Sequence, residues 1–336
     1  MQAYREQGAF RCQFDLNEDM AARPEVSVVI PTRDRAVLVD RAVAMLERQR
    51  DVECEVIVVD DGSRPEQARR IEELRDSGRA LVIRHHVSRG VAAARNSGIS
   101  TASAAWIAFL DDDDQWAPEK LRLQLDAAAR ASAEFVYGPV AVTDGTATTY
   151  VDPAPDAEAL LETLLCWNEV PAGSSNVLAT AAALEAVGGW DERFDHMPDW
   201  DLWIRLAAGH AAATIPNVAV AYLTHPGSML TDADGLDREM DLLAAKHEEL
   251  SRRAGIRFDR LRFDRWAALG YRRRGRRLRA ATEYIRVSAR HRSPSDLARG
   301  VACLFGERVI RAGKPSGPLP SWFEPLGRVG VNRDDS

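Results

Sequence analysis

Apolar and polar positions in the first 135 residues follow a pattern typical of strands and helices in alternation. Short runs rich in β-branched residues are expected to be strands buried on both faces of a sheet, at 26–30, 55–59, 81–83 and 106–110. Apolar residues at helical spacing predict the intervening helices, over 38–49, from Pro65, over 90–99 and over 118–131. The pattern predicts an α/β fold with a mostly parallel sheet and right-handed crossovers.

The pattern changes after Phe135, where the predicted elements become shorter. They are strands over 135–151 and 213–224 and helices over 156–166 and 199–208. Beyond about Leu236 the chain is expected to be helical throughout, and from Gly313 prolines and glycines predict an irregular tail. Residues 1–24 show no clear period and are expected to form a loosely attached leader.

Composition indicates a globular protein and argues against a membrane-spanning, secreted or disulfide-rich one. The chain of 336 residues is 46% apolar and 28% charged, as in ordinary globular proteins. No run approaches the roughly 20 apolar residues of a membrane span, and residues 1–20 lack the apolar core of a secretory signal. A cytoplasmic location is therefore expected. The four cysteines are scattered, which argues against a disulfide framework or a zinc cluster.

Charge divides the chain into an acidic body and a basic C-terminal region. From Ser251 onward, 21 Lys and Arg face 8 Asp and Glu, so this region carries +13 and the remainder −20. An arginine cluster lies at 272–277. Three interpretations remain open: a solvated helix face, contact with an anionic membrane surface or a lipid-diphosphate acceptor, and nucleic-acid binding. Nucleic acid is disfavoured because aromatic residues are not interleaved through the cluster.

Polar clusters follow three of the predicted strands, at 31–34, 60–63 and 111–114. In open α/β sheets, ligands bind beyond the carboxyl ends of the strands. The last cluster is four consecutive aspartates, whose mutual repulsion is unfavourable unless a cation offsets it. Mg²⁺ and Mn²⁺ bind oxygen ligands, often one or two carboxylates together with substrate phosphates. The run therefore predicts a metal–diphosphate site, with a charged surface loop as the alternative.

Four segments together resemble the family 2 glycosyltransferases with the GT-A fold. They are Val26-Ser27-Val28-Val29-Ile30-Pro31-Thr32, Val58-Val59-Asp60-Asp61-Gly62-Ser63, Ala94-Arg95-Asn96-Ser97-Gly98, and the run from Phe109 through Asp111–Asp114 to Pro118. The resemblance covers roughly residues 24–230, and it is the combination and order of the motifs that makes it specific. It implies a GT-A domain over 25–235, with a nucleotide-binding half (25–134) and an acceptor half (135–235). A leader (1–24), a helical basic extension (236–312) and an irregular tail (313–336) complete the chain.

The resemblance also implies roles for the donor-site residues. The residues expected to bind the nucleotide-sugar are Pro31, Thr32, Arg33, Asp61, Arg95, Asp111 and Asp112. Pro31, Thr32 and Asp61 line the base pocket in this hypothesis, and Asp61 accepts from the pyrimidine N–H. Asp111 and Asp113 form the D-x-D signature, with Asp113 as metal ligand and Asp111 on the ribose side. Asp112 and Asp114 exchange these roles in an alternative that spacing does not separate.

The acceptor half supplies a candidate general base. Residues 197–206 resemble the family's acceptor-side motif, but Pro198 replaces the usual glutamate, which leaves Asp199 as the base. A helix N-terminus favours an ionised carboxylate, the form that removes a proton from a hydroxyl. The alternative is that Asp199 is only an N-cap. Asp201 and Arg205 have the spacing of a helical ion pair. His225 resembles a late histidine on the metal or diphosphate; the alternative is a structural histidine.

These observations predict inverting transfer of a single sugar from a nucleotide diphosphate-sugar, UDP-sugar favoured, to an acceptor hydroxyl, with Mn²⁺ or Mg²⁺ as cofactor. The expected acceptor is a glycan, a lipid-linked sugar or a small molecule. No Gly-x-Gly-x-x-Gly or Gly-x-x-x-x-Gly-Lys-Ser/Thr motif is found, and no Gln-x-x-Arg-Trp element of processive synthases. The alternatives are a sugar-phosphate nucleotidyltransferase, which is expected to show a glycine-rich loop after the first strand, and a catalytically degenerate scaffold.

Overall fold

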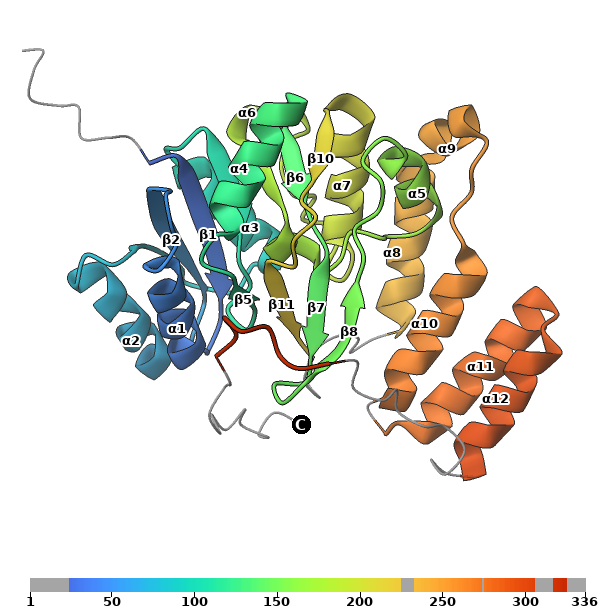
Figure 1. Ribbon diagram of the computed structural model, residues 1–336. Coiled ribbons are helices and arrows are strands. Elements are labelled where there is room, and N and C mark those ends of the chain that lie inside the picture. Colours follow the sequence, from blue (N-terminus) through green and yellow to red (C-terminus); the bar gives the residue numbers. More distant parts are fainter. Residues whose placement is uncertain (1–23, 225–232, 274, 306–316, 325–336) are drawn as a thin grey trace, which may run out of the picture.

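A computed structural model describes residues 24–224, 233–273, 275–305 and 317–324 of the chain. Its first half alternates strand and helix as predicted (Figure 1). The elements are β1 (Val26–Thr32), α1 (Ala36–Leu46), β2 (Cys54–Asp61), α2 (Pro65–Asp76), β3 (Leu81–His85), α3 (Val91–Thr101), β4 (Trp106–Phe109), β5 (Gln115–Trp116) and α4 (Lys120–Ala131). The mixed α/β fold with a mainly parallel central sheet is therefore confirmed.

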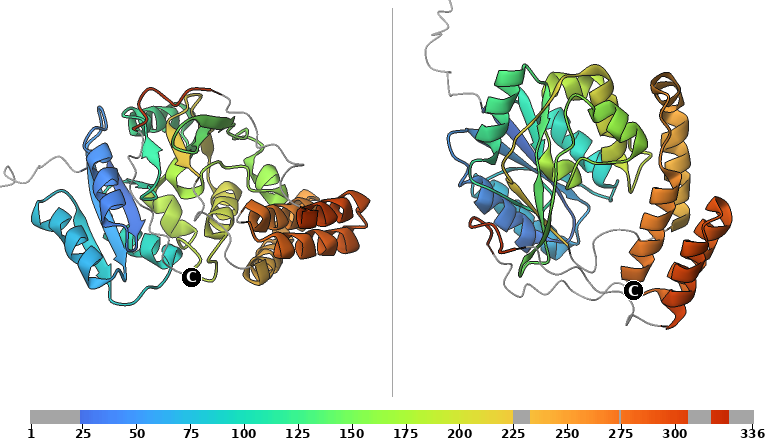
Figure 2. Two further views of the ribbon diagram at one scale, coloured as in Figure 1. Left: turned by 90° about the horizontal axis from the view of Figure 1, so that it is seen from below. Right: turned by 45° about the vertical axis from the view of Figure 1, so that its right-hand side comes forward.

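Helices cover both faces of a seven-stranded sheet with the order β10-β6-β9-β4-β1-β2-β3. Three of its strands come from the second half of the chain: β6 (Phe135–Tyr137), β9 (Leu178–Thr180) and β10 (Ala212–Thr214). Side chains along β1 alternate between the faces: Val28 and Ile30 join the apolar cluster under α1, α2 and α4, whereas Val29 joins the cluster under α3 and α7 (Pro198–Gly209). Both faces are thus buried, which explains why the strands are apolar throughout. Figure 2 shows the same layers from two further directions.

Strands β1 and β2 are longer than predicted and carry polar residues at their ends. We expected Pro31 to end the first strand, but β1 continues through it to Thr32. The backbone carbonyl of Val29 points toward β4, where it accepts from the N–H of Leu110, the residue after that strand. Pro31, two residues further along β1, has its backbone nitrogen on the same side. The register with β4 ends at Val29, so the missing N–H of Pro31 removes no sheet hydrogen bond. β2 likewise extends through Asp61, which fixes that side chain on regular backbone.

The two predicted strand regions of the second half are broken by turns. The elements there are β6 (Phe135–Tyr137), β7 (Val140–Thr143), β8 (Thr148–Asp152), α5 (Leu160–Cys166), the 3₁₀ turn η1 (Gly173–Asn176), β9 (Leu178–Thr180), α6 (Ala181–Ala186), α7 (Pro198–Gly209), β10 (Ala212–Thr214) and β11 (Val220–Leu223). β6, β9 and β10 extend the central sheet, with β9 antiparallel. The others form a second sheet in the order β5-β11-β7-β8. β5 thus joins the segment after the aspartates to the second half.

The C-terminal helices are present as expected. They are α8 (Ala233–Lys246), α9 (Glu248–Ala254), α10 (Arg260–Arg273), α11 (Arg277–His291) and α12 (Pro294–Phe305). In the predicted tail, the described residues 317–324 return to the α/β body, where Gln115 and the backbone of Glu324 exchange hydrogen bonds of 2.7 and 2.9 Å. The described helices include none with the length and apolar character that a membrane crossing requires. The proposed domain boundaries stay a prediction.

Candidate active site

The carboxyl ends of β1, β2 and β4 meet at a cavity of about 660 Å³, here called the strand-end cavity. It contains every donor-site residue that the sequence predicts within the described chain, namely Pro31, Thr32, Arg33, Asp61, Arg95, Asp111, Asp112 and Asp113. Arg35, Asp195 and Tyr222 also line it. The residues after three separate strands therefore lie together at one cavity.

The four aspartates after β4 alternate in burial. Asp112 and Asp114 are buried, whereas Asp111 and Asp113 keep part of their surface exposed. Asp112 accepts from Thr32 Oγ1 at 2.6 Å and from Arg35 Nη1 at 3.0 Å. Asp113 accepts from the same Arg35 nitrogen at 3.0 Å. This alternation favours Asp111 and Asp113 as the pair that meets a ligand, as in the predicted D-x-D assignment.

The aspartate run carries more negative charge than its neighbours offset. Burial raises the pKa of Asp112 to about 6, although Arg35 opposes the shift, and the charge of Asp113 adds to it. Burial likewise raises the pKa of Asp114 well above its ordinary value, with Asp113 and Asp111 as further causes. Crowded carboxylates of this kind suit a hard divalent cation. Among the described residues, no three His, Cys, Asp or Glu side chains form a metal site by themselves.

Asp61, at the end of β2, is held by its own loop. Its two carboxylate oxygens accept from Ser88 Oγ at 2.6 Å and from the Arg89 and Gly90 N–H groups at 2.9 Å, and His85 Nδ1 lies 2.6 Å away. Burial alone raises the pKa of Asp61, but these hydrogen bonds outweigh it and hold the pKa below its ordinary value. Asp61 therefore stays ionised and fixes the 88–90 loop. Its predicted contact with a pyrimidine stays a prediction.

Arg95 is buried in the middle of the site, on α3. Its Nη2 donates to Asp111 Oδ1 and to Ser174 Oγ, both at 2.7 Å, and its guanidinium lies 4.5 Å from the centre of the Trp190 ring. The Nε–H of Arg95 has no partner among the described residues. Arg95 is thus ion-paired with Asp111 and also lines the strand-end cavity, while its predicted contact with the nucleotide stays a prediction.

A second cavity, of about 460 Å³, adjoins the first and is here called the aromatic cavity. Its aromatic lining residues are Tyr150, Trp167, Trp200, Tyr222, Phe263 and Trp266. Two of these, Phe263 and Trp266, come from α10, so the C-terminal helices build part of the wall. The two cavities share Arg95, Asp111 and Tyr222 among their lining residues. The aspartate run and the aromatic cavity therefore belong to one continuous site.

Asp199 lies at the start of α7 and lines the aromatic cavity. Asn168 Nδ2 donates to its Oδ2 at 3.1 Å. Burial raises the pKa of Asp199 above its ordinary value, and this outweighs the backbone amide of Trp200, the charge of Arg95 and the Asn168 hydrogen bond. A raised pKa makes the ionised carboxylate a stronger base.

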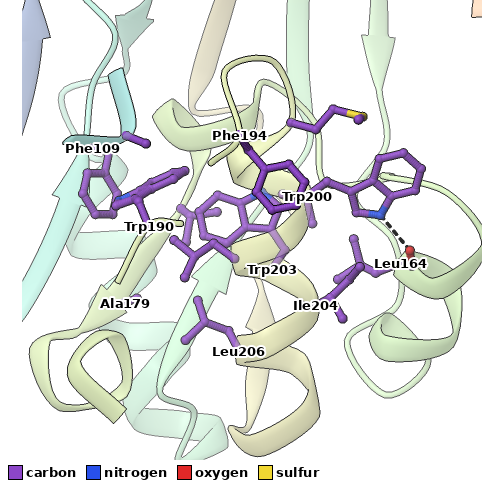
Figure 3. Packing of buried hydrophobic residues seen from close by; sticks show 14 of the residues in the cluster. Phe109, Leu164, Ala179, Trp190, Phe194, Trp200, Trp203, Ile204 and Leu206 are labelled. Atoms are coloured by element: carbon purple, nitrogen blue, oxygen red, sulfur yellow. Dashed lines mark hydrogen bonds between the residues drawn. The ribbon is translucent and has the colours of Figure 1, made fainter. Parts of the chain in front are cut away.

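Helix α7 is fixed by aromatic packing and by a buried ion-pair network. Figure 3 shows Trp200 and Trp203 among the packed apolar side chains. The Nε1–H group of Trp200 donates a hydrogen bond to the Leu164 carbonyl. Trp203 packs edge-on against Trp190, which packs edge-on against Phe109 at the end of β4. Trp203 is thus a core residue. This aromatic chain connects the strand that precedes the aspartates to the helix that carries Asp199.

The second aspartate of the α7 motif serves the fold. Asp201 is fully buried and pairs with Arg205 at 2.6 Å, as its spacing predicted, and with Lys246 at 2.7 Å. His247 Nε2 lies 2.9 Å from the same carboxylate. Arg205 in turn donates to the Val187 carbonyl at 2.6 Å. Asp201 therefore connects α7 to the end of α8, and its partner Arg205 connects α7 to the loop after α6.

Sequence reasoning missed Arg35, Asn168 and Gly173. Arg35 follows the first polar cluster directly, so its position beside the strand end was a usable signal. Asn168 and Gly173 lie between predicted elements, and nothing local indicates their contact with Asp199. A Cβ at Gly173 would come 3.0 Å from Asp199 Oδ2. His225, the other predicted metal ligand, lies outside the described residues.

The comparison with known proteins agrees with this geometry. Residues 27–183 match the model of glycosyl transferase family 2. The chain carries a family 2 glycosyltransferase domain. The match includes β1 to β9, the aspartate run and η1, so it covers most of the strand-end cavity and part of the aromatic cavity.

Proteins with similar sequences are also named as glycosyltransferases. An uncharacterised glycosyltransferase of Haemophilus influenzae is 30% identical over 186 residues, which are 54% of this chain and 61% of the relative. The Escherichia coli UDP-Glc:alpha-D-GlcNAc-diphosphoundecaprenol beta-1,3-glucosyltransferase WfgD is 30% identical over 34% of this chain and 44% of its own. The chain thus spans less than two thirds of either relative.

Structural similarity supports the GT-A fold. TarS 1–349 of S. aureus, in complex with UDP-GlcNAc, superimposes with a TM-score of 0.56 at 16% identity, over 83% of this chain and 79% of that one. At this identity the likeness concerns the fold alone. Together with the family match, it confirms the predicted GT-A glycosyltransferase architecture.

Proposed function

We propose that this chain transfers one sugar from a nucleoside diphosphate-sugar to a hydroxyl group of an acceptor, with inversion at the anomeric carbon. The observation that carries the proposal is the meeting of two cavities at Arg95 and Asp111. One contains the aspartate run at the strand ends, and the other contains Asp199. In this proposal, a donor bound in the first cavity meets an acceptor bound in the second beside these two shared residues.

The strand-end cavity is the proposed donor site. Thr32, Arg33 and Asp61 lie at the carboxyl ends of β1 and β2, where nucleotides bind in α/β sheets. Exposed Arg33 and buried Arg95 supply positive charge near the diphosphate. Uridine is the favoured base, because the Escherichia coli relative WfgD is named for transfer from UDP-Glc.

The aspartate run is the proposed binding place of Mn²⁺ or Mg²⁺. Asp113 is the proposed direct ligand, with Asp111 toward the ribose; His225 remains a second proposed ligand. The carboxylates fit such an ion, because Asp112 and Asp114 have raised pKa values caused partly by neighbouring carboxylates. When bound, a divalent ion offsets the negative charge that develops on the leaving diphosphate. Arg35, which contacts both Asp112 and Asp113, supplies positive charge at the same place.

Asp199 is the proposed general base. Its carboxylate takes the proton of the acceptor hydroxyl, and the acceptor oxygen forms a bond to the anomeric carbon from the face opposite the nucleotide. The bond between that carbon and the diphosphate oxygen breaks, and the nucleoside diphosphate leaves with the electron pair. One displacement of this kind inverts the anomeric configuration. Asn168 and the Trp200 amide hold the carboxylate in place during proton transfer.

The acceptor is proposed to be a glycan, a lipid-linked sugar or a small molecule bound against the aromatic wall. Sugar rings present C–H faces that pack on aromatic rings, and Trp167 and Trp266 are partly exposed at the cavity. Relatives named for diphosphoundecaprenol-linked acceptors, including one of Campylobacter jejuni, make a lipid-linked sugar the first acceptor to test.

A screen of nucleotide-sugars tests the proposal. The purified chain is incubated with UDP-, GDP- and dTDP-sugars, with and without Mn²⁺, and nucleoside diphosphate release is measured. We expect release from one donor class, dependent on the metal and stimulated by acceptor. Isothermal titration with UDP and Mn²⁺ checks the donor site separately. Absence of UDP binding would favour the scaffold alternative, and pyrophosphate release from a nucleoside triphosphate with a sugar phosphate would identify a nucleotidyltransferase.

A further inference from the structure

The last two described helices, α11 and α12, form a hairpin that extends away from the central sheet (Figures 1 and 2). One side of the hairpin is packed: Ala280, Ala281 and Tyr284 of α11 form a small core with Cys303 of α12 and Tyr271 of α10. Arg265 of α10 pairs with buried Asp296 at the start of α12 at 2.9 Å. The hairpin is therefore a fixed part of the molecule, held against α10.

The other side of the hairpin is apolar and exposed. Five large apolar side chains, here called the hairpin apolar face, are between 44% and 76% exposed: Leu278, Ile285, Leu297, Val301 and Leu304. On each helix they recur at helical spacing, seven apart on α11 and four and three apart on α12. A Cβ at Gly300 would lie 3.2 Å from Ile285 Cγ1, so Ile285 of α11 lies against α12, next to the residue that precedes Val301.

This concentration is unusual within the described chain. The other large apolar side chains with comparable exposure are Leu81, Val87, Tyr150 and Val151, which lie on β3, the loop after it, and β8. Single exposed apolar residues need no explanation, whereas a contiguous set on one face marks an interaction surface.

Arginines lie at both ends of the hairpin apolar face. Arg276 and Arg277 are exposed at the start of α11, beside Leu278, and Arg292 is exposed at its end. None of these three arginines has an ion-pair partner among the described residues. Residues 277–305 contain six arginines and two acidic residues. An apolar stripe between basic ends is the pattern of a helix that lies in the headgroup region of an anionic membrane.

We propose that the hairpin apolar face binds the surface of an anionic lipid bilayer, with Leu297, Val301 and Leu304 inserted among the headgroups and Arg276 and Arg277 on the lipid phosphates. A second copy of the chain fits less well, because an antiparallel pairing of two such faces brings basic ends together. The inference rests on the proposed function only in one respect: a lipid-linked acceptor would then be met at the membrane surface.

Vesicle flotation with the full chain tests the proposal. The probes are phosphatidylcholine vesicles with and without phosphatidylglycerol. We expect flotation with the anionic vesicles that weakens as salt rises, and little with the neutral ones. Substituting Leu297→Ser, Val301→Ser and Leu304→Ser together should reduce bound protein at least about tenfold. The matched control is Leu81→Ser with Val87→Ser, which removes equally exposed apolar side chains elsewhere and should bind as the parent does.

Two double arginine variants test the electrostatic contribution to vesicle binding. Arg276→Gln with Arg277→Gln should weaken flotation with anionic vesicles, whereas Arg69→Gln with Arg70→Gln, exposed on α2, should not. Thermal unfolding and UDP binding of each variant show that the fold and donor site are intact. Vesicle binding does not require transfer activity, so the two proposals fail separately. Equal flotation of the apolar-face variant and the parent, absence of flotation of the parent, or a parent dimer that the serine variant dissociates would each overturn the inference.

Discussion

Asp199 acquires its properties from residues that are distant in sequence. Asn168 donates to it from the loop after α5, and Arg95 acts on it from α3 through its charge. Burial raises its pKa, and these groups limit the rise. The balance decides over which pH range the carboxylate is ionised and able to accept a proton.

Substituting Asn168→Ala should shift the pH profile of transfer. The ionised carboxylate loses a hydrogen bond, so its pKa rises further. The acid limb of the kcat profile should move to higher pH, with activity lost near the limb and recovered above it. The profile of kcat against pH at saturating donor measures this shift. An acid limb at an unchanged position would contradict the role of Asn168.

The backbone at Gly173 leaves room for the carboxylate. Gly173 has φ of +47°, and an added Cβ would meet Asp199 Oδ2 at 3.0 Å. Gly173→Ala should therefore lower kcat roughly tenfold or more by displacing the base. Gly78→Ala is the control, since Gly78 has φ of +72° with nothing near its Cβ position. Both variants should lose about 1 kcal/mol of unfolding free energy, and only Gly173→Ala should lose turnover; equal kcat values would refute the argument.

The position of a residue was predictable where a short motif follows a strand, whereas the role of each residue stays a proposal. Asp111 and Asp113 follow β4 directly, and their placement needs only the strand and the chain direction. The contacts of Arg35 with Asp112 and of Asn168 with Asp199 were not predicted, because the partners are 77 and 31 residues apart. Such contacts depend on how the elements pack, which no local pattern records.

Helix α7 shows how one element divides support from chemistry. Asp199 faces the cavity, while Asp201, two residues on, is buried among Arg205, Lys246 and His247. Burial alone raises the pKa of Asp201, but these partners outweigh it and hold the pKa below its ordinary value. Its contribution to stability is therefore present above about pH 4 and lost as pH falls through the lowered folded-state pKa.

Asp201→Asn should destabilise the protein by about 3 kcal/mol, because it leaves buried cationic partners without their counter-charge. Urea unfolding at neutral pH measures the loss. Asp126→Asn removes an exposed pair of the same spacing, Arg122–Asp126, and should cost about 0.5 kcal/mol or less. Equal losses for the two variants would show that the Asp201 network does not hold α7.

Helix α10 contributes to the site although its sequence predicts only a helix. Phe263 and Trp266 reach the aromatic cavity, and Trp266 packs edge-on against Trp167. The sequence predicted helices after Leu236, but a helix does not record which surface it will cover. Its part in the site therefore required the structure.

Trp266→Ala should raise the KM for the acceptor about tenfold with little change in the KM for the donor, because one face of the acceptor cavity is lost. Initial rates with each substrate varied in turn separate the two constants. Trp266→Phe keeps an aromatic face and should recover most of the acceptor affinity. A rise in the donor KM of the same size would place Trp266 elsewhere in the mechanism.

At the scale of the molecule, the α/β alternation was enough to predict the fold class and the edge of the sheet where the site lies. The second half was harder, because β6, β9 and β10 are each three residues long and join the same sheet as the first half. Short strands leave little periodicity to detect. The junction of two cavities, which carries the functional proposal, appears only when both halves are assembled.

The central claim is that donor and base occupy separate parts of one site, and Asp199→Asn tests it most directly. Transfer should fall about 100- to 10,000-fold, the usual contribution of a general base, while UDP binding in the presence of Mn²⁺ stays within about twofold of the parent. Asp195→Asn, which changes another carboxylate on both cavities, is the comparison variant and should lose far less. Substantial turnover by Asp199→Asn, or a loss confined to Asp195→Asn, would contradict the account.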